Sequence, residues 1–301
     1  MLNAFLALSL TVVATETGTV DPPFTTEGLE QPFERGQPGL LWLTARAPVA
    51  RVEGELLGRP TLWVPWSRGR VLGLIAVAVD DTLGSQVLRL RYASAAGETR
   101  EVEIPVQVIE RDYPSDTLRV APRYTKLSAR DKKRVARERR RLDAMWQQRS
   151  QERLWRGSFV RPIDTKVTSV FGERRVFNGK QRSRHLGLDL DGNGGESIVA
   201  ANRGRVALAE ALFYSGNSVI LDHGQGLYTL YFHMQQIDVK EGDLVDKGQR
   251  LGTVGKTGRV TGPHLHLSVK LAGVYLDPSA VLALDLEGDP LQVPASSAPA
   301  P

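Results

Sequence analysis

Short β-prone runs separated by turn residues fill most of this chain, and one charged segment of helix formers interrupts them. Between residues 20 and 110 the runs include LLWLTARA, TLWVPW, VLGLIAVAVD and QVLRLRYAS, with turns such as GQPG, SRGR and DDTLGS between them. Six or seven short strands at this spacing predict an antiparallel β-sandwich of immunoglobulin-like kind over residues 20–112. No cluster of His, Asp and Glu typical of a metal site occurs there, so we expect a spacer or docking module.

The interrupting segment, residues 126–156, has a composition unlike that of either flank. It begins with Ser-Ala-Arg-Asp at 128–131, a start similar to a capping box, and strong helix formers follow. Its apolar residues form one narrow stripe: Val135, Leu142 and Trp146. The segment holds twelve Lys or Arg and four Asp or Glu in a chain of net charge +5, so the basicity is local. We predict one long basic helix within a linker over 113–157.

The role of this helix has two interpretations. A solvated connector between two domains is the preferred one, and a surface that attracts anionic cell-envelope polymers is the alternative. Nucleic acid is not expected as a partner, because no aromatic stacking platform accompanies the charges.

The two ends of the chain predict export and a disordered tail. Residues 1–14 form an apolar run that is too short to cross a bilayer and ends in small residues. We expect a signal peptide over 1–19, with a buried first strand as the alternative, and a protein of the periplasm, cell envelope or exterior. No later run is long enough for a transmembrane span. The Pro-, Ala- and Ser-rich end predicts a disordered tail over 285–301.

A second β-rich domain is predicted over 158–284, mostly antiparallel and with almost no helix. Four of the five histidines of the chain fall in three short segments of this domain: His185-Leu-Gly-Leu-Asp189, Tyr-Phe-His233 and His264-Leu-His266. Cysteine is absent, which excludes thiolate metal sites, disulfides and cysteine nucleophiles. Because neutral imidazole and carboxylate are the usual nitrogen and oxygen ligands of catalytic zinc, the three segments predict a metal site and metal-assisted hydrolysis.

Strand periodicity predicts how these side chains are presented. The run HLHLSVKL places His264 and His266 on one face, opposite its leucines and roughly 6–7 Å apart at Cα. This spacing suits one ligand and one proton carrier. The same alternation places His233 on the polar face of its strand, opposite Phe232. We expect His223, which lies in a glycine-rich turn, to bond local backbone rather than a metal.

The segment from His185 to Asp189 must bend. In a straight strand the two side chains would be separated by roughly 13 Å, too far to share an ion whose ligand atoms lie about 2 Å from it. We expect Gly187 to permit the tight or unusual backbone that the bend requires. Asp191 is a less favoured substitute for Asp189.

Together these motifs resemble the lysostaphin-like, LytM-type zinc endopeptidases that cut bacterial cell-wall peptides. The resemblance covers roughly residues 158–283, includes FGERRVFNG at 171–179 and implies a β-hammerhead-like fold. It also implies peptidoglycan stem peptides or cross-links as substrates and a zinc-bound water as the nucleophile. The residues that it implies are zinc ligands His185, Asp189 and His266, with His264 and His233 on either side of the water.

The chemistry that follows from the resemblance gives each of the remaining residues a role. His264 is the expected general base, and His233 is expected to stabilise the oxyanion or to protonate the leaving amine. Asn178 and Arg182 are expected to line the substrate groove because they come just before His185.

Other functions are weighed against hydrolysis. A non-catalytic wall-binding or hydrolase-activating protein with the same fold is the main alternative. The segment 239–249 resembles the repeat of biotinyl and lipoyl carriers, but no Met-Lys or Lys-Met pair is present for modification. The segment 252–257 resembles a phosphate loop but lacks the first glycine of that motif.

Overall fold

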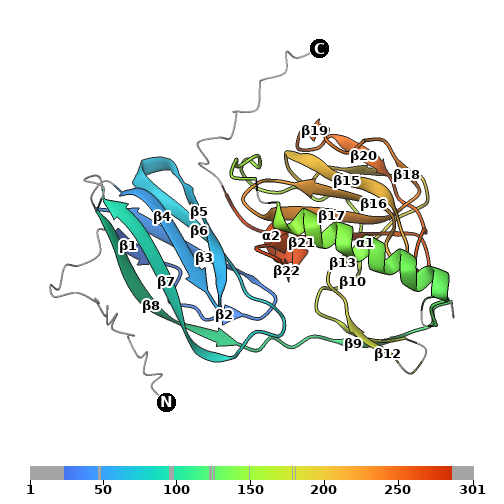
Figure 1. Ribbon diagram of the computed structural model, residues 1–301, viewed down its shortest axis with the longest axis horizontal. Coiled ribbons are helices and arrows are strands. Elements are labelled where there is room, and N and C mark those ends of the chain that lie inside the picture. The colour runs from blue at the N-terminus through green and yellow to red at the C-terminus, as the bar shows by residue number, and fades with distance from the viewer. Residues whose placement is uncertain are drawn as a thin grey trace, which may run out of the picture. The chain divides into compact units, whose positions relative to one another are not determined.

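The computed structural model describes residues 24–46, 49–94, 98–121, 124, 126–148, 150–177, 179 and 181–286. The chain divides into two compact units, Met1–Arg35 with Gly39–Glu110, and Gly36–Pro38 with Arg111–Pro301. Both units are built mainly from strands, as predicted (Figure 1). Among the described residues, no helix is long and apolar enough to span a membrane. The predicted signal peptide and residues 287–301 of the predicted tail lie outside the described residues.

Eight strands make up the first unit. Their bounds are β1 (Phe24–Glu27), β2 (Phe33–Glu34), β3 (Pro38–Ala45), β4 (Val49–Leu56), β5 (Arg59–Pro65), β6 (Arg70–Ala76), β7 (Gly84–Ser94) and β8 (Thr99–Ile109). They pair in the order β1-β3-β6-β5-β4-β7-β8-β2. Alternate residues of β8 are buried, and side chains such as Leu41 of β3 and Leu90 of β7 join one apolar cluster. The strands therefore close over a single core, and immunoglobulin-like connectivity stays a prediction.

The second unit is organised around β21 (His264–Leu271). The main sheet has the order β10-β13-β21-β17-β16-β15-β19, and β22 also pairs with β21. The bounds of these strands are β10 (Val167–Ser169), β13 (Leu188–Asp191), β15 (Gly204–Leu212), β16 (Gly216–Asp222), β17 (Leu227–Met234), β19 (Leu244–Val245) and β22 (Val274–Leu276). Every pairing in this sheet is antiparallel, as predicted. The central position of β21 brings its two histidines against neighbours on both sides.

Two small sheets and a short helix complete the second unit. One sheet joins β14 (Ser197–Val199), β20 (Arg250–Thr253) and β18 (Gln236–Ile237). The other joins β12 (Gln181–Arg184), β11 (Arg174–Phe177) and β9 (Ser115–Leu118), with β9 parallel to β11. The short helix is α2 (Pro278–Leu282). Since β9 belongs to the segment expected to be a linker, part of that segment is a strand of this unit.

The basic helix α1 (Ala129–Gln147) also packs on the second unit instead of being a solvated connector. Its N-cap is Ser128, whose side chain accepts a hydrogen bond from the backbone of Asp131. One side of the helix covers the cluster formed by β15, β16 and β17 (Figure 1). The helical residues in that contact are Leu142, Met145 and Trp146. Leu142 and Trp146 of the stripe predicted from the sequence thus belong to an interface, which removes part of their apolar area from water.

The helix is shorter than the segment 126–156 suggested. It ends at Gln147, and the chain then turns inward so that Trp155 is fully buried. The backbone amide of Leu154 donates to the carbonyl of His223 at 2.8 Å. Burial of these apolar side chains overrides the local helix propensity.

Candidate metal centre

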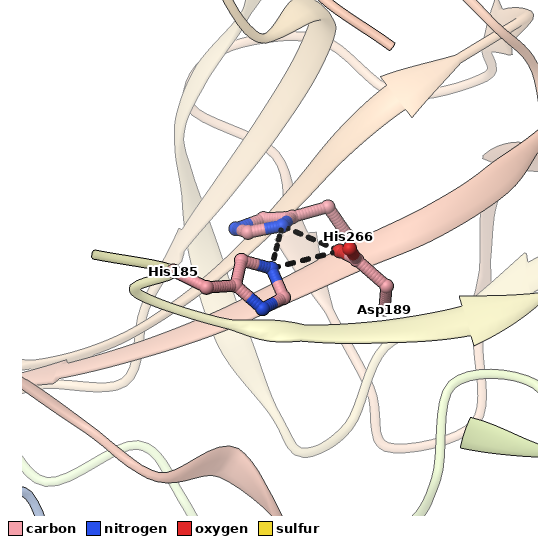
Figure 2. A group of neighbouring side chains, drawn as sticks. All are labelled: His185, Asp189 and His266. Atoms are coloured by element: carbon pink, nitrogen blue, oxygen red, sulfur yellow. Dashed lines mark hydrogen bonds and ion pairs between the residues drawn. The ribbon is translucent and has the colours of Figure 1, made fainter. Parts of the chain in front are cut away.

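Two adjacent strands and one bend bring three ligand atoms together. Asp189 on β13 lies directly opposite His266 on β21, and the chain bends at Gly187 so that His185 returns towards both. The Oδ1 atom of Asp189 lies 3.0 Å from Nε2 of His185 and 2.8 Å from Nδ1 of His266. The two nitrogens are 2.9 Å apart. Figure 2 shows the three side chains pointing at one another, as a shared ion requires.

Gly187 is needed for space rather than for an unusual backbone angle. Its φ lies outside the left-handed region, so of the tight or unusual backbone expected from the sequence the bend shows the tight form. A Cβ at this position would lie 2.4 Å from Nε2 of His266 and 2.5 Å from the carbonyl oxygen of Leu267. The bend therefore passes so close to β21 that only glycine leaves room for the imidazole.

Hydrogen bonds behind the cluster fix the tautomer of each imidazole. Nδ1 of His185 lies 2.7 Å from the carbonyl oxygen of Val170, so its N–H donates there. Nε2 of His266 lies 2.9 Å from Oγ of Ser268, which gives its own hydrogen to the carbonyl of Leu186 at 2.7 Å. In each neutral ring the nitrogen that faces the cluster therefore carries a lone pair.

The result is a cluster of three lone pairs without a proton between them. Lone pairs this close repel one another. Because His185 is 2% exposed and Asp189 is 6% exposed, bulk water cannot relieve that repulsion. A cation about 2.0–2.2 Å from each atom would relieve it, and two imidazole nitrogens with one carboxylate oxygen suit zinc. Three protein ligands leave a fourth position open, which is typical of catalytic zinc sites. The residues present fit the metal implied by the sequence.

A partly buried arginine supports the carboxylate from behind. Nη2 of Arg175 donates to Oδ2 of Asp189 at 2.7 Å, and its Nε donates to Glu173 at 2.9 Å. Sequence reasoning missed Arg175, because nothing in the 171–179 motif singled out one of its two arginines.

His264 borders the cluster without belonging to it. Its Nε2 lies 3.7 Å from Oδ1 of Asp189. Its Nδ1 lies 3.0 Å from the carbonyl oxygen of Gly262, so the lone pair of the neutral ring is on Nε2. Asp191 is paired with His264 across the strands but is not one of the three clustered residues. Of the two aspartates proposed from the sequence, Asp189 is therefore the one in the cluster.

His233 reaches the same pocket by a route that alternation did not predict. Phe232 lies opposite His266 and stacks on its ring, with centroids 5.5 Å apart. A regular strand would therefore turn His233 away from the cluster. Instead its φ is +64°, and this left-handed conformation brings the ring to 5.0 Å from that of His264. Such a conformation costs about 1–3 kcal/mol in a residue other than glycine and is concentrated at functional sites.

The environment of His233 keeps its ring neutral. Its Nδ1 lies 2.8 Å from the carbonyl oxygen of Thr257. Burial, together with the neighbouring rings of His266 and His264, lowers the pKa of His233 to about 3.

His223, the fifth histidine, is not part of the cluster. Its two ring nitrogens lie 2.7 Å from the carbonyl oxygen of Arg203 and 2.7 Å from Oγ1 of Thr229. Burial lowers the pKa of His223 to about 4.

A pocket of about 430 Å³ opens over the cluster. All five residues that the resemblance implied line it, and so do residues from β9, β11 and the segment between β20 and β21. Phe177, Tyr214 and Arg259, which the sequence did not indicate, also line the pocket. Arg182 lies on β12 opposite Val176, and its side chain is outside the described residues, as is Asn178. Their predicted place in the groove stays a prediction.

Comparisons with known proteins agree with this geometry. Residues 183–278 match the sequence profile of Peptidase family M23. The chain is 38% identical over 115 residues to Peptidoglycan DD-endopeptidase ShyA of Vibrio cholerae, which covers 37% of the chain and 27% of ShyA. It is 38% identical over 132 residues to ShyC of the same organism, which covers 43% of the chain and 30% of ShyC. The matched part thus spans less than a third of either relative.

A solved structure extends the likeness beyond this region. A crystal structure from Pseudomonas aeruginosa assigned to the M23 peptidases has a TM-score of 0.64 and 28% identity, and the match covers 84% of this chain and 96% of that one. The resemblance predicted from the histidine motifs is confirmed over residues 183–278, which match peptidase family M23.

Proposed function

We propose that this protein is an exported zinc metalloendopeptidase that hydrolyses peptide bonds in the stem peptides or cross-links of peptidoglycan. The observation that carries the proposal is the set of three proton-free ligand atoms, 2.8–3.0 Å apart, in a pocket that two further histidines line. Relatives named peptidoglycan DD-endopeptidases support the choice of substrate. The family M23 match supports a metallopeptidase.

In this proposal His185, Asp189 and His266 hold the metal. When bound, zinc would polarise the scissile carbonyl group and lower the pKa of a water molecule from 15.7 to about 7. The bonds to Val170, Ser268 and Arg175 hold the three side chains in the orientation that binding needs.

The two remaining histidines move the protons. The unprotonated Nε2 of His264 lies beside the cluster, and His264 takes a proton from the attacking water as general base. The Nδ1–H of His233 donates to the carbonyl of Thr257, which leaves its Nε2 for the pocket. In this proposal Nε2 receives the proton that His264 took from the water and passes it to the leaving amine. The strained backbone of His233 fixes this position, as a group that acts in a transition state requires.

We further propose that the outer face of α1 attracts anionic polymers of the cell envelope. Four exposed cations recur at helical spacing along it: Arg130, Lys133, Arg137 and Arg140. Within the described part of the chain none of the four forms an ion pair, whereas Arg141 pairs with Glu210 and Glu241. Wild-type binding that weakens steeply with salt, together with weaker and less salt-dependent binding by a variant with these four residues changed to Gln, would support this partner. Salt-independent binding would contradict it.

The experiment for the main proposal is digestion of purified peptidoglycan by the full chain, with mass spectrometry of the products. We expect new free amino termini at one defined bond, loss of activity with a strong chelator and recovery with zinc. A His264→Ala variant should keep most of its zinc and lose turnover. A fully zinc-loaded protein that cleaves no wall of any cross-link type would contradict hydrolysis and favour the non-catalytic, hydrolase-activating alternative.

A further inference from the structure

We propose that Arg259 forms a carboxylate-binding subsite in the pocket and selects cross-links in which the residue that supplies the leaving amine carries a free carboxylate. The inference rests on the proposed function and adds a substrate class to it. It predicts a preference for cross-links through a diamino acid with a carboxylate beside the scissile nitrogen, such as diaminopimelate. Cross-links through the side-chain amine of lysine lack that group.

The position of Arg259 is set by two aromatic rings. Its guanidinium carbon lies 4.4 Å from the ring centroid of Phe177 and 4.9 Å from that of Tyr214, and its backbone N–H donates to the carbonyl of Tyr214 at 2.8 Å. These contacts hold the guanidinium against two aromatic rings without using its N–H groups, which remain for a ligand.

The charge of Arg259 has no counter-ion within the described residues. Arg175, the neighbouring arginine on the lining, is matched by Asp189 and Glu173. For Arg259 the described side chains supply neither a carboxylate nor another hydrogen-bond acceptor. Asp116 also lines the pocket, but no ion pair joins it to Arg259. Burial lowers the pKa of Arg259 against a smaller opposing effect of Tyr214, and the nearby charge of Arg175 lowers it further.

A half-buried guanidinium of this kind suits a planar anion. Its N–H groups match the two oxygens of a carboxylate, and such charge-assisted pairs are stronger than neutral hydrogen bonds. Arg259 lies on the segment between β20 and β21 that also carries Thr257, the partner of His233, and leads into His264. An anion bound there occupies the same pocket as both proton carriers.

The chemistry of a DD cross-link places a carboxylate in that region. When D-alanine is joined to the amine on the D-centre of diaminopimelate, the carbon next to the scissile nitrogen carries a free carboxylate. Hydrolysis breaks the bond between this nitrogen and the alanine carbonyl, and the leaving fragment keeps the carboxylate. Amidation of the group removes its charge and leaves the scissile bond intact, which isolates the proposed contact.

The test compares two synthetic cross-linked peptides with the full-length zinc-loaded protein. One is D-alanyl-meso-diaminopimelate linked through the D-centre as the free acid, and the other carries a primary amide at that carboxylate. We expect the wild type to prefer the free acid by about 10- to 100-fold in kcat/KM. Arg259→Gln should reduce the preference towards one, and Arg259→Lys should keep part of it. The matched control is Arg250→Gln, because Arg250 pairs with Asp238 and does not line the pocket.

The outcomes separate this inference from the proposed function. Equal cleavage of the two peptides by the wild type, or an unchanged preference in Arg259→Gln, would overturn the subsite while peptidase activity stands. Failure of the wild type to cleave either peptide or purified wall would instead overturn the proposed function. Melting temperature and zinc content of each variant identify a folding defect, and the wild-type comparison needs no variant at all.

Discussion

Replacement of Ser268 by alanine tests whether the hydrogen bond behind His266 controls the metal site. Ser268 is 1% exposed, so water cannot replace its hydroxyl group. The change leaves Nε2–H of His266 and the carbonyl of Leu186 without their partners at 2.9 and 2.7 Å. Each unsatisfied buried group costs about 1–3 kcal/mol. The loss of such a support typically lowers metal affinity 10- to 100-fold, or about 1.4–2.8 kcal/mol.

The measurement is competition for zinc against a fluorescent chelator, with urea unfolding of the metal-free protein alongside it. Ser218→Ala is the matched control, because Ser218 is 0% exposed and its Oγ bonds Ser215 and Gly216 at 3.0 and 2.8 Å without touching the cluster. We expect both variants to lose stability and only Ser268→Ala to lose zinc affinity. Wild-type affinity in Ser268→Ala, or an equal loss in the control, would refute the reasoning.

Two other predictions concern the bend and the buried imidazole outside the site. Gly187→Ala should weaken zinc binding by displacing His266, whose Nε2 would lie 2.4 Å from the new Cβ, whereas Gly194→Ala, with its nearest neighbour at 3.4 Å, should bind as the wild type. Equal affinities in a zinc titration would disprove this. Because the pKa of His223 is about 4 when folded and about 6.5 when unfolded, the unfolded chain binds more protons between these values. The free energy of unfolding should therefore fall as pH falls from 6.5 to 4, by about 3 kcal/mol from this group, and urea unfolding of His223→Gln should show a smaller decrease.

Sequence patterns predicted the part of the site whose residues lie close together along the chain. Two histidines on one face of a strand, and a histidine four residues before an aspartate with glycine between them, indicated a metal site in these segments. The family resemblance then implied His185, Asp189 and His266 as the ligands. The alternation in HLHLSVKL also placed Ser268 on the face of His266, which was the signal for its supporting role. The burial of Lys270 on that face, at 8% exposed, was not predictable, because Trp146 of α1 covers it.

The features that were missed depend on contacts between distant segments or on a single backbone angle. Period-two alternation cannot indicate that His233 adopts a positive φ, so the face assigned to it was wrong although its pocket was right. Arg259 contacts Phe177, which is 82 residues earlier in the chain. Such a contact exists only once the sheets have formed, and no local pattern encodes it. The helix boundary failed for the same reason, since Trp155 is buried by tertiary packing.

The central claim is that His185, Asp189 and His266 hold one zinc ion together. The most direct measurement is zinc content combined with zinc X-ray absorption of the full chain, for the wild type and for His185→Ala, Asp189→Ala and His266→Ala. We predict one zinc per wild-type chain with two imidazoles and one carboxylate in its coordination shell, and little zinc in each variant. A wild-type protein that binds no zinc, or three variants that each retain it with unchanged coordination, would contradict the account.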